Sequence, residues 1–266
     1  MYTKDENIYL FDNGKIRTIC KNVWSYKVLY GKFLMFEKDD LFVFDSVKNT
    51  LTKVNIDKSY LNKMISYSIN LSNKIAFISR DDIYLLDNKV EKLYVLSESD
   101  ETLYSVDWLD NDNLLLLIES SYFHMPVLDY FRFEISNNEL LGYNNNPRYY
   151  IIRNKYNYFY NTAGFYISEK LTGDVVKHYF LSLIGFDVSY DEKLGVYSVR
   201  DKVIVINFET DEKEEFNISD VKNIKISFDD RYLLLHMEDK TVNILDMKTK
   251  NVIKFALNVD FICWML

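Results

Sequence analysis

One sequence motif recurs seven times: an apolar, β-rich run that ends in an acidic or amide residue and is followed by a polar turn. The closing residues are Asp12, Asp45, Asp87, Glu134, Glu169, Asn207 and Asp246. The intervals between them are 33, 42, 47, 35, 38 and 39 residues. A period of this length is typical of repeat architectures in which one supersecondary unit is copied along the chain.

Each repeat contains more than this one strand. A short charged turn, such as Asp201-Lys202, precedes most copies and joins them to an earlier apolar run, which predicts a β-hairpin. An innermost strand comes before the hairpin, as at 226–229, and an outer strand follows the hairpin, as at 252–255. The sequence therefore predicts an all-β, seven-bladed β-propeller of four-stranded antiparallel blades. Six blades is the alternative, because the fifth repeat fits the pattern poorly.

The two ends of the chain predict how the propeller closes. The chain begins within a hairpin, and residues 260–266 read as a lone innermost strand. A propeller must remove its open edges, so we expect this strand to complete the N-terminal blade. Otherwise Phe261, Ile262 and Trp264 would form an exposed apolar tail.

Two segments of the seventh repeat resemble WD40-type propellers. Residues 225–233 resemble the turn between the first and second strands of that family, and residues 241–250 resemble its third strand, with Leu245 where the family usually has Trp. The resemblance implies the propeller architecture over nearly the whole chain. The Gly-His dipeptide of the family is absent, so the resemblance implies no functional subfamily.

Composition is consistent with one domain over residues 1–266, because aromatic residues make up 16% of the chain and favour pleated surfaces. With 7 Gly and 2 Pro, the turns must rely on Asp, Asn and Lys. Asp12, Asp45, Asp87 and Asp246 are expected to form turns through their side chains. The stretch 57–63 could form one helical turn.

Charge and targeting signals restrict the partners and the compartment. The net charge of −8 argues against nucleic-acid binding and fits solubility or a basic protein partner. No run is apolar enough to span a membrane, and the N-terminus has no signal-peptide pattern. Cys20 and Cys263 are interpreted as reduced, small apolar residues. We therefore expect a cytoplasmic monomer.

The sequence predicts no catalytic, cofactor-binding or metal-binding residue. His124, His178 and His236 fall in different blades and strand layers, and no metal-ligand spacing, nucleophile motif or phosphate loop is present. Asp107 and Asp187 lie on innermost strands. Asp107 is aligned with Asn70, Ser189 and Ser227 as a turn cap, and Asp187 is interpreted as a solvated channel charge near Lys225.

One connection departs from the repeat. In the fourth blade, residues 120–127 replace the short charged turn between the second and third strands, and we expect an exposed loop there. Aromatic residues, Met and Arg are enriched at protein interfaces. The connection 144–150 is expected on the same face. The predicted partner-binding residues are Tyr122, Phe123, His124, Met125, Arg148 and Tyr149.

The resulting hypothesis is a non-enzymatic scaffold that binds another protein through this face. An antitoxin-like or immunity protein, or a complex-assembly protein, is its more specific version. Two alternatives remain open: a propeller hydrolase or lyase with clustered acids or a metal at the central channel, and a carbohydrate-binding propeller with aromatic sites between blades.

Overall fold

Alternating apolar and polar residues give the chain short strands. The computed structural model describes residues 1–12, 15–29, 32–80, 82–95, 101–122, 125–143, 149–161, 164–179, 183–256 and 258–265. The chain divides into two compact units, which are described separately. Unit 1 contains residues 1–24, 149–166 and 178–266, and unit 2 contains residues 25–148 and 167–177.

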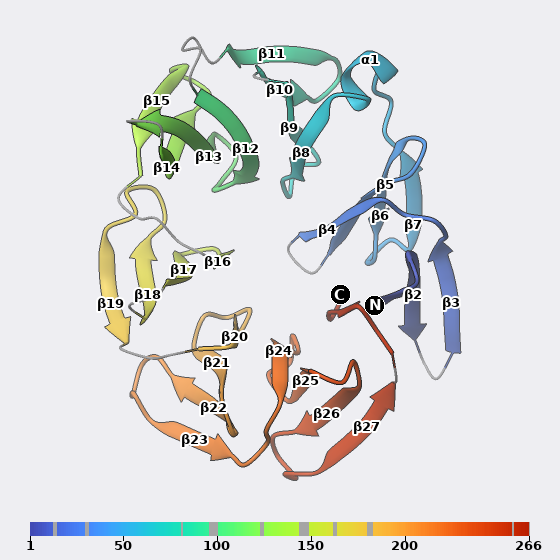
Figure 1. Cartoon of the computed structure of the whole chain (residues 1–266), viewed down its shortest axis with the longest axis vertical. Helices are drawn as coiled ribbons and strands as arrows, with labels where there is room; N and C mark the ends of the chain where they lie inside the picture. The colour runs from blue at the N-terminus through green and yellow to red at the C-terminus, as the bar shows by residue number, and fades with distance from the viewer. Residues whose placement is uncertain are drawn as a thin grey trace. The chain divides into compact units, whose positions relative to one another are not determined.

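Unit 2 contains three consecutive sheets, each with its strands in chain order (Figure 1). The first has β4 (Ser25–Leu29), β5 (Phe33–Glu37), β6 (Leu41–Asp45) and β7 (Thr50–Lys53). The second has β8 (Met64–Ile69), β9 (Ile75–Ser79), β10 (Asp82–Leu86) and β11 (Val90–Val95). The third has β12 (Glu101–Trp108), β13 (Asn113–Tyr122), β14 (Met125–Glu134) and β15 (Glu139–Gly142).

A single helical turn, α1 (Lys58–Leu61), connects the first two of these sheets. Its N-cap is Asp57, whose carboxylate accepts a hydrogen bond from the Ser59 backbone N–H at 2.7 Å. Tyr60 packs edge-on against Phe77 and Tyr84, and Leu61 is buried in the same core cluster. The short helix expected at 57–63 is confirmed.

Two further sheets of unit 1 also have their strands in chain order. One has β20 (Gly185–Val188), β21 (Leu194–Val199), β22 (Lys202–Asn207) and β23 (Lys213–Phe216). The other has β24 (Val221–Ile226), β25 (Tyr232–Met237), β26 (Val242–Asp246) and β27 (Val252–Ala256). The residues of one sheet are divided between the two units. This sheet has β16 (Tyr149–Ile152), β17 (Tyr156–Asn161), β18 (Gly164–Glu169) and β19 (Val175–Tyr179).

The remaining sheet of unit 1 combines strands from both ends of the chain. Its order is β28 (Phe261–Ile262), β1 (Tyr2–Lys4), β2 (Asn7–Asp12) and β3 (Lys15–Cys20). Tyr2 pairs with Ile262, and the Met1 ammonium group donates a hydrogen bond to the Cys263 carbonyl at 2.9 Å. Figure 1 shows the N- and C-terminal ends of the chain beside each other. The prediction that the C-terminal strand completes the N-terminal blade is confirmed.

Over the described residues, then, the strands form seven four-stranded antiparallel sheets, the blades of a seven-bladed β-propeller. This all-β fold confirms the predicted class and rejects the six-bladed alternative, since the fifth repeat forms the complete sheet β16–β19. All seven predicted motif strands are the third strands of their sheets. The single domain expected over 1–266 stays a prediction.

The turns use the residue types that the composition predicts. Backbone with positive φ, which is costly for most side chains, is found at Asn73, Asp211, Asp230 and Lys250, among others. Asp45 and Asp246 each accept two backbone N–H bonds from the turn that follows. Asp87 differs, because its carboxylate forms an ion pair with Lys74 at 3.6 Å.

Apolar clusters lie between neighbouring sheets. In unit 2 one cluster joins β4–β7 to β8–β11 and a second joins β8–β11 to β12–β15; in unit 1 a third joins β20–β23 to β24–β27. No helix among the described residues has both the length and the apolar character needed to cross a membrane.

Candidate functional site

Two of the six predicted partner-binding residues, Tyr122 and Met125, form the last pair of the hairpin β13–β14. Where a loop over 120–127 was expected, the strands continue until Tyr122 pairs with Met125. Only Phe123 and His124 separate the two strands. These two residues and Arg148 lie outside the described residues. Tyr149 is the first residue of β16 rather than part of a loop.

This hairpin is longer than the others. β13 and β14 have 10 residues each, whereas the second and third strands of the sheet β20–β23 have 6. The outer strand β15 pairs only with Phe131–Glu134, so the hairpin continues well past that ladder. Leu128 on β14 and Tyr104 on the neighbouring β12 are 40% and 44% exposed. One apolar side chain of β14 and one aromatic side chain of β12 are therefore exposed to solvent.

Asp107 on β12 is buried and neutralised by a cation. The Lys27 ammonium lies 2.5 Å from its carboxylate and also donates to the Val106 carbonyl at 3.2 Å. The Ser68 hydroxyl donates to the same carboxylate at 3.1 Å. These contacts tie the first strands of three sheets of unit 2 together, which is a structural role.

Asp187 on β20 has the equivalent place in unit 1. Arg153 lies 3.4 Å and Lys225 lies 3.7 Å from its carboxylate, which also accepts the Ile226 backbone N–H at 3.1 Å. Its side chain is 7% exposed, so the interpretation as a solvated charge was wrong. Because both carboxylates are held by cations, neither is placed as a free general base.

The alignment of Asp107 with the turn caps was also wrong. Asp107 pairs with Leu115 just as Ser68 pairs with Ala76, one pair before the strand ends, so these two positions are equivalent. The cap of that turn is Asp110, whose carboxylate accepts the backbone N–H groups of Asp112 and Asn113 at 2.8 Å. Asn70, Ser189 and Ser227 do cap their turns as expected.

Two tryptophans, one at the end of β12 and one shortly after β28, make the same contact. The Trp108 indole N–H donates to the Ser68 carbonyl at 3.1 Å in unit 2, and the Trp264 indole N–H donates to the Lys225 carbonyl at 3.2 Å in unit 1. Trp264 therefore docks the chain's last strand as Trp108 docks an internal one. Burial of the neighbouring Cys263 raises the pKa of its thiol to about 11, so it is an inert thiol at neutral pH.

The described histidines are accounted for by packing. His178 on β19 stacks on Tyr166 with ring centroids 4.0 Å apart. His236 on β25 has a ring nitrogen 2.9 Å from the Val259 carbonyl, and burial lowers its pKa. Among the residues that the structure describes, no group of three or more His, Cys, Asp or Glu side chains could hold a metal ion.

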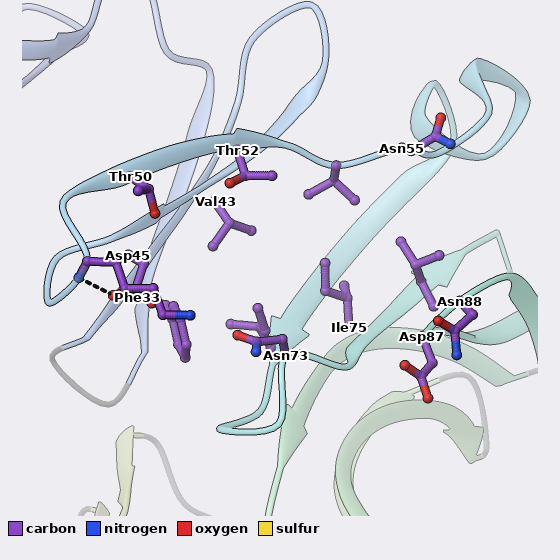
Figure 2. A pocket seen from close by; sticks show the side chains of 14 residues that line it. Phe33, Val43, Asp45, Thr50, Thr52, Asn55, Asn73, Ile75, Asp87 and Asn88 are labelled. Carbon is purple, nitrogen blue, oxygen red and sulfur yellow. Dashed lines mark hydrogen bonds between the residues drawn. The ribbon is translucent and has the colours of Figure 1, made fainter.

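A cleft of about 400 Å³ opens in unit 2 between the sheets β4–β7 and β8–β11 (Figure 2). We call it the cleft throughout. Its lining consists of Phe33, Val43, Asp45, Lys48, Thr50, Thr52, Val54, Asn55, Ile69, Asn73, Ile75, Leu86, Asp87 and Asn88. The sequence analysis missed it.

The cleft has an apolar floor and a polar rim. Figure 2 shows Val43, Thr50 and Thr52 on one sheet and Ile75 and Asp87 on the other, with the hollow between them. The two rim carboxylates already have cations nearby, because Asp45 lies 3.9 Å from Lys32 and Asp87 lies 3.6 Å from Lys74. A volume of this size is in the range of ligand-binding pockets.

Comparison with known proteins supports the fold and goes no further. No family model matches the sequence, and no curated protein matches it. Among solved structures, the chain is similar to one described as "Oligogalacturonate lyase in complex with manganese", with a TM-score of 0.61 and 11% identity over 85% of this chain and 73% of that chain. At this identity the likeness shows a shared propeller fold alone.

Proposed function

We propose that this protein is a non-enzymatic binding protein that holds another protein through the face carrying the hairpin β13–β14. The observation that carries the proposal is the length of the hairpin, whose strands have 10 residues each and extend beyond the partner strand β15. The contact residues in this proposal are Tyr122, Phe123, His124, Met125, Arg148 and Tyr149.

The remainder of the molecule supports binding rather than chemistry. Asp107 and Asp187, the two carboxylates considered for catalysis, are buried in ion pairs that join different sheets of their own unit. Such contacts stiffen a sheet array, and a stiff surface loses little conformational entropy when a partner binds. Because this protein has a net charge of −8, the proposed partner is a basic protein. A basic partner is what the antitoxin-like or immunity role requires. A cytoplasmic location would keep the free thiols of Cys20 and Cys263 reduced.

The test is a capture experiment with a matched control. The triple variant Tyr122→Ser, Phe123→Ser and Met125→Ser should keep the melting temperature of the wild type and lose the captured partner, identified from native cells by mass spectrometry. The control is Val252→Ser with Ile253→Ser, two outer-strand residues that are 49% and 62% exposed. The control should capture the partner as the wild type does.

Two results would reject the proposal. If the triple variant unfolds, its side chains belong to the packed interior and not to an interface. If it stays folded and captures the same partner, binding occurs elsewhere. A stoichiometric divalent metal in the purified native protein would instead support the hydrolase or lyase alternative.

A further inference from the structure

The cleft lies in a blade whose outer strand lacks an aromatic ring that five of the seven blades supply. At or next to the end of the outer strand, the described part of the chain places an aromatic residue in five sheets: Tyr94, Tyr143, Tyr179, Phe216 and Phe255. In the sheet β4–β7 the corresponding residue is Val54. Strand register places small residues at the position of Phe216 in two more sheets, Cys20 opposite Ile8 and Ala256 opposite Val242, and beside Ala256 the preceding Phe255 supplies the ring.

Strand register establishes that Val54 and Phe216 are equivalent. In the sheet β4–β7, Val43 pairs with Thr52, and the Val54 N–H donates to the Leu41 carbonyl at 2.9 Å. In the sheet β20–β23, Val205 pairs with Glu214, and Phe216 pairs with Val203. Val54 and Phe216 therefore each lie two residues after an equivalent pair between the third and the outer strand.

In each of the five sheets, the aromatic residue contacts the next sheet of its own unit. The Tyr94 ring lies 5.3 Å from Phe133, the Tyr179 ring 6.2 Å from Phe208 and the Phe255 ring 4.7 Å from Phe11. The Phe216 ring lies 4.8 Å from the Lys250 ammonium, and the Tyr143 hydroxyl donates to the Lys170 carbonyl at 3.4 Å. An aromatic ring is thus the usual occupant of this place.

A shorter turn on the facing sheet enlarges the gap. In the sheet β24–β27, residues 246–251 separate Leu245 from its partner Val252, and they include the buried Met247. In the sheet β8–β11, only residues 87–89 separate Leu86 from its partner Val90. The side chains that Met247 and Lys250 contribute to one interface have no counterpart in the other.

The missing side chains leave the apolar floor uncovered. Val205 and Leu245 are 7% and 1% exposed beneath Phe216, whereas their equivalents Val43 and Leu86 are only half-buried. Covering apolar surface of this kind with a further apolar group lowers the free energy of the complex. The rim adds the hydroxyls of Thr50 and Thr52 and the amides of Asn55, Asn73 and Asn88, which can hydrogen-bond to a peptide backbone (Figure 2).

We infer that the cleft receives an aromatic side chain from a peptide segment of another protein, in the place that Phe216 fills within its own chain. A peptide is the occupant because the chain itself fills the place with a ring carried on an extended backbone. The rim carboxylates of Asp45 and Asp87 already lie near Lys32 and Lys74. The peptide therefore needs no positively charged residue beside its aromatic side chain. The inference concerns other strands than the hairpin β13–β14 and does not rest on the proposed function.

The experiment measures binding of two blocked tripeptides, acetyl-Gly-Phe-Gly-amide and acetyl-Gly-Ala-Gly-amide, by NMR titration. The Phe peptide should bind saturably, with shifts centred on Val43, Val54 and Leu86, and the Ala peptide at least tenfold more weakly. Equal binding of the two peptides would overturn the inference. Benzyl alcohol is the third probe, and if it binds as tightly as the Phe peptide the peptide occupant is wrong.

Two variants fill the cleft from opposite sheets, so failure of one to fold leaves the other. Val54→Phe supplies the missing ring, and Leu86→Phe enlarges the facing wall. Either variant, once shown to be folded by its melting curve, should weaken the Phe peptide at least tenfold. Unchanged affinity in a folded variant would overturn the inference. The triple Ser variant of the hairpin should bind the peptide as the wild type does, which separates this site from the proposed function.

Discussion

Two interfaces between neighbouring blades share a strand register and differ in what lies above their floor. Between β20–β23 and β24–β27, Phe216 and Met247 cover Val205 and Leu245. Between β4–β7 and β8–β11, Val54 and a shortened turn leave the cleft. The repeat therefore tolerates loss of a large aromatic residue at one blade while the strands remain paired.

The open interface gains packing at its other end. The connection after β7 contains α1, from which Tyr60 and Leu61 join the core cluster with Phe77 and Tyr84. In unit 1, β24 begins soon after β23 ends, at Val221 after Phe216. The floor residues and the packing around α1 therefore hold the two blades together, and the cleft end is open to a ligand.

The largest effect is expected from Phe216→Val, which makes the closed interface resemble the open one. Loss of most of a buried ring should lower the free energy of unfolding by about 2–3 kcal/mol. It should also create a second site for the Phe peptide. Chemical denaturation and peptide stoichiometry are the measurements. A stability equal to that of the wild type would mean that Phe216 is not a packing residue, contrary to our comparison.

A smaller effect is expected at Asp230, whose counterpart at the cleft rim is Asn73. Both residues have positive φ, 54° and 65°. Burial, aided by the carboxylates of Asp191 and Asp229, raises the pKa of Asp230 to about 6. Because the folded state holds this proton more tightly than the unfolded state, the contribution of Asp230 to stability grows as pH falls from 6 to about 4 and is lost as pH rises through 6.

Asp230→Asn should therefore stabilise the protein at pH 7 and remove this part of the pH dependence. The gain is about 1 kcal/mol after allowance for solvent screening of a partly exposed group. Melting temperatures of both proteins at pH 7 and pH 5 provide the measurement. If the variant and the wild type differ equally at the two pH values, the carboxyl group does not titrate in this window.

The smallest effect is expected from Lys250→Met. The Lys250 ammonium covers the Phe216 ring and forms an ion pair with Glu214, but both charged side chains are about half exposed, 51% and 49%. Loss of the charge should cost about 0.5 kcal/mol at low salt. The cost should shrink at high salt, and a salt-independent loss would point to packing by the lysine stem instead.

Much of the fold could be predicted from the sequence because each third strand carries its own end signal. Asp45 and Asp246 accept the backbone N–H groups of the following turn, which is why an acidic residue closes the motif. The sheet β16–β19 was harder to predict, because residues such as Tyr158 and Phe159 pack aromatic rings on both sides of the strand. That pattern hides the alternation on which strand prediction depends.

The cleft could not be predicted from single positions. Its existence depends on a small residue at Val54 and on a short turn after Leu86, which belong to different sheets. Alignment of the seven outer strands would have shown Val54 where Tyr94 and Phe216 stand, which is the available signal. The role of Asp107 was misread for a related reason, since the register of its strand depends on pairing with Leu115 and not on residue type.

The central claim is that an aromatic ring from outside occupies the cleft as Phe216 occupies its own interface. The most direct measurement is the set of intermolecular nuclear Overhauser effects of bound acetyl-Gly-Phe-Gly-amide. We predict cross-peaks from its ring protons to the methyl groups of Val43, Val54 and Leu86. Cross-peaks confined to other methyl groups, such as those of Leu128 on the hairpin β13–β14, would contradict the account.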